Sequence, residues 1–165
     1  MWMIVILALF GSLMGFVRLS AQTDLTRVSD TAKVVALSEN MAFYRSAVID
    51  YVNTPGSARS VCEQIGTIPT GYVPLTPPLW TNCILSDGTV VIYARSQPEV
   101  DIIDAIGRMA QGSMMAGRAN TTIAAPAAAW IEPPFLSTDA PMTVPALPSS
   151  ALLLMKGVPI WLASP

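Results

Sequence analysis

The first 53 residues carry two hydrophobic patterns, one after the other. Residues 1–17 are apolar almost throughout and contain no charged side chain. As a helix they extend about 25 Å, close to the shortest length that crosses a bilayer. Residues 23–53 contain neither Pro nor Gly, and their apolar positions recur at alternating steps of three and four. This spacing is typical of a helix with one buried face, here formed by Val34, Leu37, Met41, Tyr44, Val48 and Tyr51.

The two patterns predict one continuous rod. No Pro or Gly lies between Val17 and Asn53, so a single helix of about 50 residues and about 75 Å is expected. Pro55 ends it. We interpret residues 1–17 as a membrane anchor, 18–53 as the amphipathic continuation and 54–165 as an extracytoplasmic domain. The buried face is expected to dock on the domain's own sheet, and the GxxxG spacing of Gly11 and Gly15 is weak support for a further contact inside the bilayer.

The remainder of the chain predicts a small sheet with a second helix. Residues 89–94 follow an Asp87–Gly88 turn and are rich in β-branched and aromatic side chains, so a strand is expected there. A short amphipathic helix should then begin with Pro98 in its first turn and stop before Gly112. Its apolar positions at helical spacing are Ile102, Ile103, Ile106 and Met109.

Weaker patterns complete the domain. Residues 57–85 are rich in turn formers and predict a long ordered loop. The remaining candidate strands are residues 121–125, 128–131, 151–155 and 158–162. The last two flank Lys156 and Gly157 and predict a terminal hairpin, with a bulge or a single bent strand as the alternative. We expect an α+β fold in which a long N-terminal helix, membrane half plus amphipathic half, packs on a small antiparallel sheet in a pilin-like layout.

Composition agrees with lipid contact, because mean hydropathy is +0.51 and only 12% of the residues are charged. A cleaved signal peptide is the rival interpretation of the first segment. It requires basic residues before the apolar run and small residues at the cut. No Lys or Arg precedes the run, and the candidate cut after Ala21 has Leu19 two residues upstream. A retained single-pass anchor is therefore favoured.

Two patterns disagree about the side of the membrane on which the domain lies. Arg18, Arg27 and Lys33 follow the apolar segment and favour a domain on the inner side. Cys62 and Cys83 are the only cysteines, and one such pair is typical of a structural disulfide in an oxidising compartment. The bond would close a loop of about 20 residues and contribute about 3 kcal/mol. Two buried free thiols in a cytosolic domain are the alternative.

The chain lacks the residues that most kinds of catalysis require. The chain contains no His, which excludes Ser-His-Asp triads and His-bearing zinc sites. Asp101 with Asp104 is interpreted as a solvated helix surface, and the nearness of Ser149 and Ser150 to Lys156 as coincidence. We expect no enzyme activity, cofactor, metal or small-molecule substrate. The nine Lys and Arg residues are dispersed, so no nucleic-acid partner is expected.

Four segments resemble one family. They are "MAFYRSAVIDYV" (41–52), "LTPPLW" with "TNCI" (75–84), "DGTVVIYA" (87–94) and "LPSSALLLMKG" (147–157). Together they are similar to the PilM proteins of type IVb thin-pilus systems, often carried on conjugative plasmids. Ser149 and Ser150 depart from the family's pattern, which has a Pro and Gly turn there. The resemblance implies an inner-membrane anchor with the C-terminal domain in the periplasm, in agreement with the cysteines.

The expected function is a non-catalytic component of type IVb or conjugative pilus assembly, bound to the membrane by one helix and in contact with other pilus or pilin-like proteins. A general periplasmic envelope adaptor is the alternative, and an enzyme that uses carboxylates alone is the third class. The processing signal of a prepilin is not matched, because Ser20 stands where the pattern that starts at Gly15 and Phe16 requires Glu. A non-polymerising accessory protein is therefore expected.

Overall fold

The computed structural model describes residues 2–62, 73–120, 129–133, 142–144, 146–147 and 154–164. For residues 2–25, 129–130, 142 and 144 only the backbone is described.

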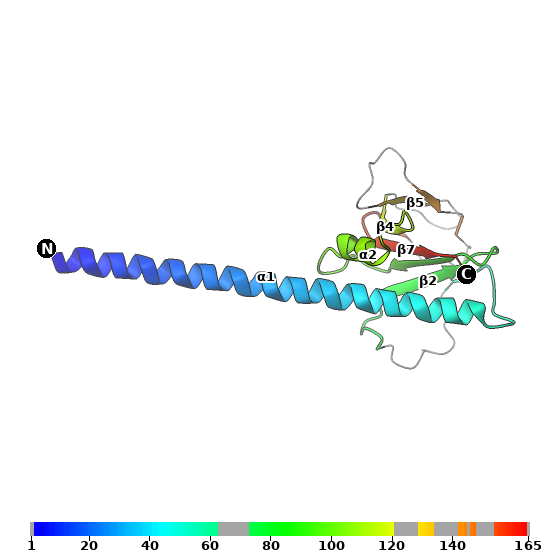
Figure 1. Cartoon of the computed structure of the whole chain (residues 1–165), viewed down its shortest axis with the longest axis horizontal. Helices are drawn as coiled ribbons and strands as arrows, with labels where there is room; N and C mark the ends of the chain where they lie inside the picture. Colours follow the sequence, from blue (N-terminus) through cyan, green and yellow to red (C-terminus); the bar gives the residue numbers. More distant parts are fainter. Residues whose placement is uncertain are drawn as a thin grey trace.

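One helix, α1 (Trp2–Asn53), makes up nearly a third of the chain, with 52 residues. At 1.5 Å per residue it is about 78 Å long. It is unbroken, as the absence of Pro and Gly after Val17 predicts. Its C-terminal part lies along the domain and its N-terminal part projects away from it (Figure 1). The helix ends at a turn in which the Thr54 amide donates to the Tyr51 carbonyl and Gly56 has a φ of +85°.

The described strands form one seven-stranded sheet in the order β1-β2-β3-β7-β4-β5-β6. Every neighbouring pair is antiparallel. The strands are β1 (Val61–Cys62), β2 (Trp80–Ile84), β3 (Val90–Ala94), β4 (Ala116–Ala119), β5 (Ala129–Glu132), β6 (Met142–Val144) and β7 (Pro159–Ala163). A second helix, α2 (Ile103–Met109), connects β3 to β4. The predicted combination of a long N-terminal helix with an antiparallel sheet is confirmed.

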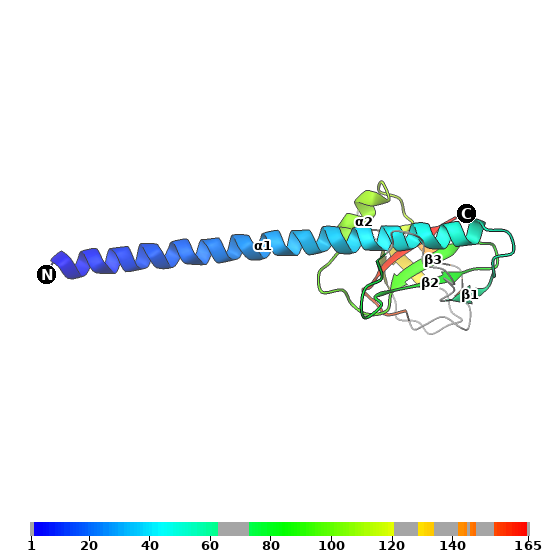
Figure 2. The same ribbon diagram turned by 90° about the horizontal axis from the view of Figure 1, so that it is seen from below.

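The core lies between α1 and the centre of the sheet. Helix α1 contacts β2, β3, β7 and α2, and it crosses the domain beside β2 and β3 (Figure 2). All residues of β2, β3 and β7 are buried, so these strands are covered on both faces. Burial of each large apolar side chain contributes about 1.5–3 kcal/mol. The centre of the sheet is therefore the main source of stability.

Strand β2 corrects the prediction of a long loop over residues 57–85. The sequence Trp-Thr-Asn-Cys-Ile lacks the alternation of apolar and polar residues that marks a half-exposed strand. All five residues are buried, and polar Thr81 and Asn82 are among them. Pro77 and Pro78, shortly before the strand, also favoured a loop.

Strand β4 was not predicted because its Ala-Gly-Arg-Ala sequence has low strand propensity. Its Gly117 is required by packing. A Cβ atom built there would lie 2.3 Å from the carbonyl oxygen of Glu132 in β5. Only a residue without a side chain allows the two backbones to approach so closely. Strands β1 and β6, of two and three residues, were also not predicted.

Helix α2 is shorter than predicted. It begins at Ile103, so Pro98 lies before the helix and is not in its first turn. Asp101 supplies the local start signal, because its Oδ1 accepts a hydrogen bond from the Ile103 amide (3.0 Å). The other carboxylate oxygen of Asp101 pairs with Arg118 of β4. Asp101 is therefore part of the connection between helix and sheet.

The predicted terminal hairpin is wrong. The turn at Lys156 and Gly157 is present, with Gly157 at a φ of +92°. However, β7 pairs with β3 on one side and β4 on the other, so its two sides are taken by strands other than the one predicted, and Leu154 forms an isolated bridge. Residues 151–153, and the candidate strand 121–125, lie outside the described residues.

Candidate interaction surface of the long helix

The predicted apolar face of α1 is turned towards the domain. Met41 and Val48 have no exposed surface, at 0% each. The other four members, Val34, Leu37, Tyr44 and Tyr51, are partly buried against the same core. We call these six residues the inner face of α1. Its role in the structure is to hold helix and sheet together.

Polar contacts set the position of α1 along β2. The Tyr44 hydroxyl donates to Oδ1 of buried Asn82 (2.9 Å). The indole N–H of Trp80 donates to Oδ1 of Asn40 (2.8 Å), and the Asn40 amide in turn donates to the carbonyl of Val73 (2.9 Å). Because these bonds have defined directions, a shift of the helix by one turn would break all three.

A cation–π contact adds to this docking. The guanidinium of Arg45 lies 4.9 Å from the ring centroid of Trp161 in β7, a distance at which the ring attracts a cation. Burial lowers the pKa of Arg45 from its ordinary value, because the charged form loses part of its hydration. Within the described part of the chain, Nε of Arg45 has no hydrogen-bond partner, so the ring is the contact that offsets this loss.

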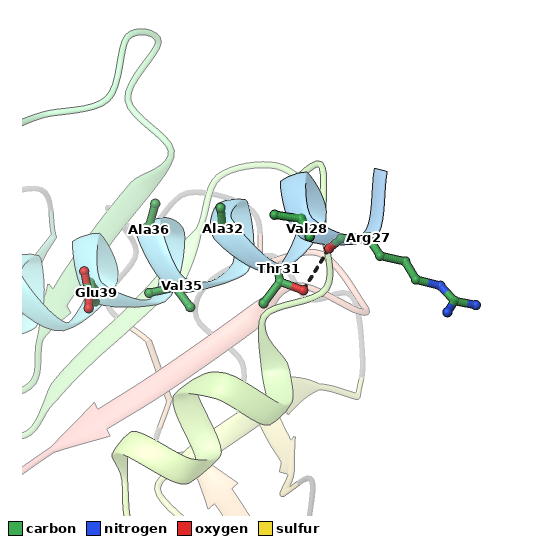
Figure 3. A pocket seen from close by; sticks show the side chains of 7 residues that line it. All are labelled: Arg27, Val28, Thr31, Ala32, Val35, Ala36 and Glu39. Atoms are coloured by element: carbon green, nitrogen blue, oxygen red, sulfur yellow. Dashed lines mark hydrogen bonds between the residues drawn. The ribbon is translucent and has the colours of Figure 1, made fainter. Parts of the chain in front are cut away.

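The opposite side of α1 is also apolar, yet it is exposed. Val28 is 68% exposed and Phe43 is 62% exposed. Figure 3 shows Val28, Ala32 and Ala36 along one edge of a shallow groove and Thr31 and Val35 along the other. These residues lie roughly half a turn around the helix from the inner face. We define the outer strip as Val28, Ala32, Val35, Ala36, Glu39, Phe43 and, from α2, Met109.

The outer strip continues from α1 onto α2. A second groove is lined by Glu39, Ala42, Phe43 and Ser46 of α1 together with Met109, which is 40% exposed. Glu39 lines both grooves and therefore stands where they meet. Arg27 marks the other end of the strip, and its side chain extends away from the groove (Figure 3). The strip is thus an apolar surface with one acid near its middle.

A third groove lies between α1 and the loops of the domain. It is lined mainly by apolar residues of α1 and of the segments 75–79 and 96–99. Lys33 and Glu99 close its rim with an ion pair of 3.1 Å. Both partners are largely exposed, so the pair contributes little to stability. Its charges are already matched within the chain.

Cys62 and Cys83 form a disulfide, with a sulfur–sulfur distance of 2.08 Å. The two residues face each other across β1 and β2, and Cys83 is fully buried. The bond attaches the two-residue edge strand β1 to the sheet. It is not part of the outer strip, and we assign it a structural role.

The remaining predicted site residues, Gly11 and Gly15, fall where no side chain is described. They belong to residues 2–17, the part of the predicted anchor that lies in α1. Over the residues that are described, no helix combines the length and apolar character that a membrane crossing needs. The same residues contain no group of three or more His, Cys, Asp or Glu side chains placed to hold a metal.

The outer strip was missed in the sequence, although a pattern for it exists. Val28, Ala32, Val35, Glu39, Ala42 and Ser46 recur at steps of four and three, the same spacing as the inner face. Four of the six are small or polar, so the larger side chains of the inner face dominate the pattern.

Together these features define an α+β protein in which one long helix docks on the sheet by one face and presents a second apolar face to solvent. A model of the PilM family matches residues 8–162, nearly the whole chain. The chain belongs to the PilM family, and the resemblance of its four segments is confirmed. Membership supports a role related to type IVb pili. Neither the curated proteins nor the solved structures contain a significant match.

Proposed function

We propose that this PilM-family chain is a membrane-anchored, non-catalytic component of type IVb pilus assembly that acts through protein–protein contacts. The observation that carries the proposal is the family match over residues 8–162. The domain lies in the periplasm and the N-terminal helix in the inner membrane.

The anchor is supported by sequence and shape together. Residues 1–17 contain no charge, and residues 2–17 form the far end of a helix that projects from the domain (Figure 1). As a helix the uncharged segment extends about 25 Å, close to the shortest length that crosses the roughly 30 Å hydrocarbon core.

The periplasmic location is supported by the disulfide. Cys62 and Cys83 are joined, and structural disulfides persist in the oxidising periplasm but are rare in the cytosol. The action through contacts is supported by the outer strip, because exposed apolar patches on folded proteins commonly mark interaction sites.

The test is a deletion of the gene in the native host, combined with C-terminal reporter fusions. Loss of surface pili in electron micrographs, restored by the intact gene, is the expected result. A fused alkaline phosphatase should be active, and a fused cytosolic-only fluorescent protein dark. Normal pili in the deletion strain would contradict the pilus role, and envelope defects with normal pili would favour a general envelope adaptor. An inactive phosphatase fusion would contradict the location alone.

A further inference from the structure

We propose that the outer strip binds a helix of a different pilus protein, which packs along α1 and places a Lys or Arg against Glu39. The proposal rests on the function proposed above and specifies the chemistry of the partner.

The shape of the strip fits a helix. Two rows of side chains spaced four residues apart, Val28-Ala32-Ala36 and Thr31-Val35-Glu39, border the groove (Figure 3). Helices pack by placing such a row of one helix into the groove of another. The two alanines keep one border low, and small residues at such spacing allow helix backbones to approach closely. A helix is therefore the complementary occupant.

The strip also carries an unmatched charge. Glu39 is the single acid among the residues that line either groove of the strip. Among the described residues it forms no ion pair, whereas Lys33 pairs with Glu99 and Arg45 stacks on Trp161. An occupant that covers Glu39 removes it from water, and that cost is offset most directly when the occupant brings a cation that also donates hydrogen bonds to the carboxylate. The partner is therefore apolar with one Lys or Arg at this level.

A second copy of the chain does not meet these requirements. Two parallel copies in register would place Glu39 against Glu39. An antiparallel pair would match Glu39 with Arg27, but its N-terminal halves would point in opposite directions and not enter one membrane. A parallel pair shifted by the 12 positions between Arg27 and Glu39 would displace one anchor by about 18 Å along its axis. The occupant is therefore another protein.

The experiment uses the full chain, expressed in the deletion strain. The photo-crosslinking amino acid p-benzoylphenylalanine replaces Phe43, an exposed aromatic residue of the strip. On irradiation we expect one adduct with another pilus protein, identified by mass spectrometry. Glu39→Lys in the same chain should lower the adduct at least about tenfold, since a covered ion pair becomes a like-charge contact.

The matched control is Asp30→Lys. Asp30 is an exposed acid of the same helix and lies roughly half a turn away from the strip. This variant makes the same charge change and should leave the adduct within about twofold. Equal abundance, and equal protection of Cys62 and Cys83 from alkylation, show that both variants fold.

A compensating change gives the decisive result. In the adduct partner, the Lys or Arg nearest the crosslink is changed to Glu. This change should restore both adduct and pili to the Glu39→Lys strain, and it should not do so with Asp30→Lys. If the compensating change fails to restore the adduct or fails to restore the pili, the proposal that a Lys or Arg of the partner lies against Glu39 is wrong.

Three other outcomes overturn the inference. They are an adduct between two copies of this chain, an adduct that persists undiminished in Glu39→Lys, and the lack of any adduct in cells that assemble pili. The failures of the two proposals are distinguishable. If deletion leaves pili intact, the pilus function is wrong. If deletion removes pili while Glu39→Lys assembles them normally, only the strip inference is wrong.

Discussion

The two faces of α1 both carry apolar residues, but they have opposite environments. The inner face has Met41 and Val48 fully buried against the sheet. The outer strip leaves Val28 and Phe43 largely in solvent. On both sides of α1, residues recur at steps of three and four. The comparison shows that helical periodicity identifies a face that is able to bury itself, but not whether the covering surface comes from the same chain.

The largest expected effect separates the two faces directly. Val48→Asp should lower the free energy of unfolding by about 3–5 kcal/mol, because it places an unpaired charge in the core. Phe43→Asp, on the outer strip, should change it by no more than about 0.5 kcal/mol. Urea unfolding of the full chain in mild detergent, followed by tryptophan fluorescence, measures both. Equal losses would mean that the outer strip is also part of the folded core.

The disulfide should affect the sheet without affecting the outer strip. Changing Cys62 and Cys83 together to Ser should lower the free energy of unfolding by about 3 kcal/mol, because the unfolded chain regains the freedom of the closed loop. The same unfolding assay measures this, and thiol alkylation of the denatured wild-type chain checks the bond. Two reactive thiols in the wild type would reject it. If the variant with Ser at both cysteine positions still folds, the crosslink from the photo-reactive residue that replaces Phe43 should persist.

A substitution at Gly117 in β4 should lower the free energy of unfolding, but by less than Val48→Asp on the inner face. Gly117→Ala forces a Cβ atom against the backbone of Glu132, and we expect a loss of about 2 kcal/mol. Gly112→Ala is the control, since a Cβ there meets nothing within 4 Å. In Gly112→Ala the only expected cost is the backbone strain of an alanine at a φ of +71°, about 1 kcal/mol. A smaller loss for Gly117→Ala than for the control would contradict the close approach of β4 and β5.

The smallest effect belongs to a surface turn that contacts neither face. Asp87 accepts hydrogen bonds from the amide and hydroxyl of Thr89, and these bonds lower its pKa below the ordinary value. Its contribution to stability is therefore present above the pKa of the unfolded chain and is lost as the pH falls through the lowered value. Unfolding curves of the wild type and Asp87→Asn should differ at pH 6 and converge in acid. If the stability difference between the wild type and Asp87→Asn grew towards low pH, the pKa of Asp87 would be raised by folding and not lowered.

The sequence predicted those parts of the fold whose local pattern and final environment agree. The inner face and β3 satisfy this condition, because a helix with one buried side and a β-branched run are both legible without knowledge of the partner. Strand β2 does not, since burial on both sides removes the alternation and admits Thr81 and Asn82. Strand β4 is defined by the approach of another backbone to Gly117, which no local window contains.

The candidate site was harder to predict than the fold. The disulfide followed from the number of cysteines, and the family from short segments spread along the chain. The outer strip is recognised because Val28 and Phe43 remain exposed in the folded domain. Which side of α1 remains exposed depends on where the sheet lies. Sequence spacing alone gives both faces of α1 the same pattern, so the side that remains free was visible only once the domain had been placed.

The position of β7 has a consequence for biosynthesis. This strand is the last element along the chain, yet it lies between β3 and β4. The β1-β2-β3 and β4-β5-β6 halves can join only after residues 159–163 have left the ribosome. Such pairings between distant parts of a chain form slowly. The sheet is therefore complete only when residues 159–163 have paired with β3 on one side and β4 on the other.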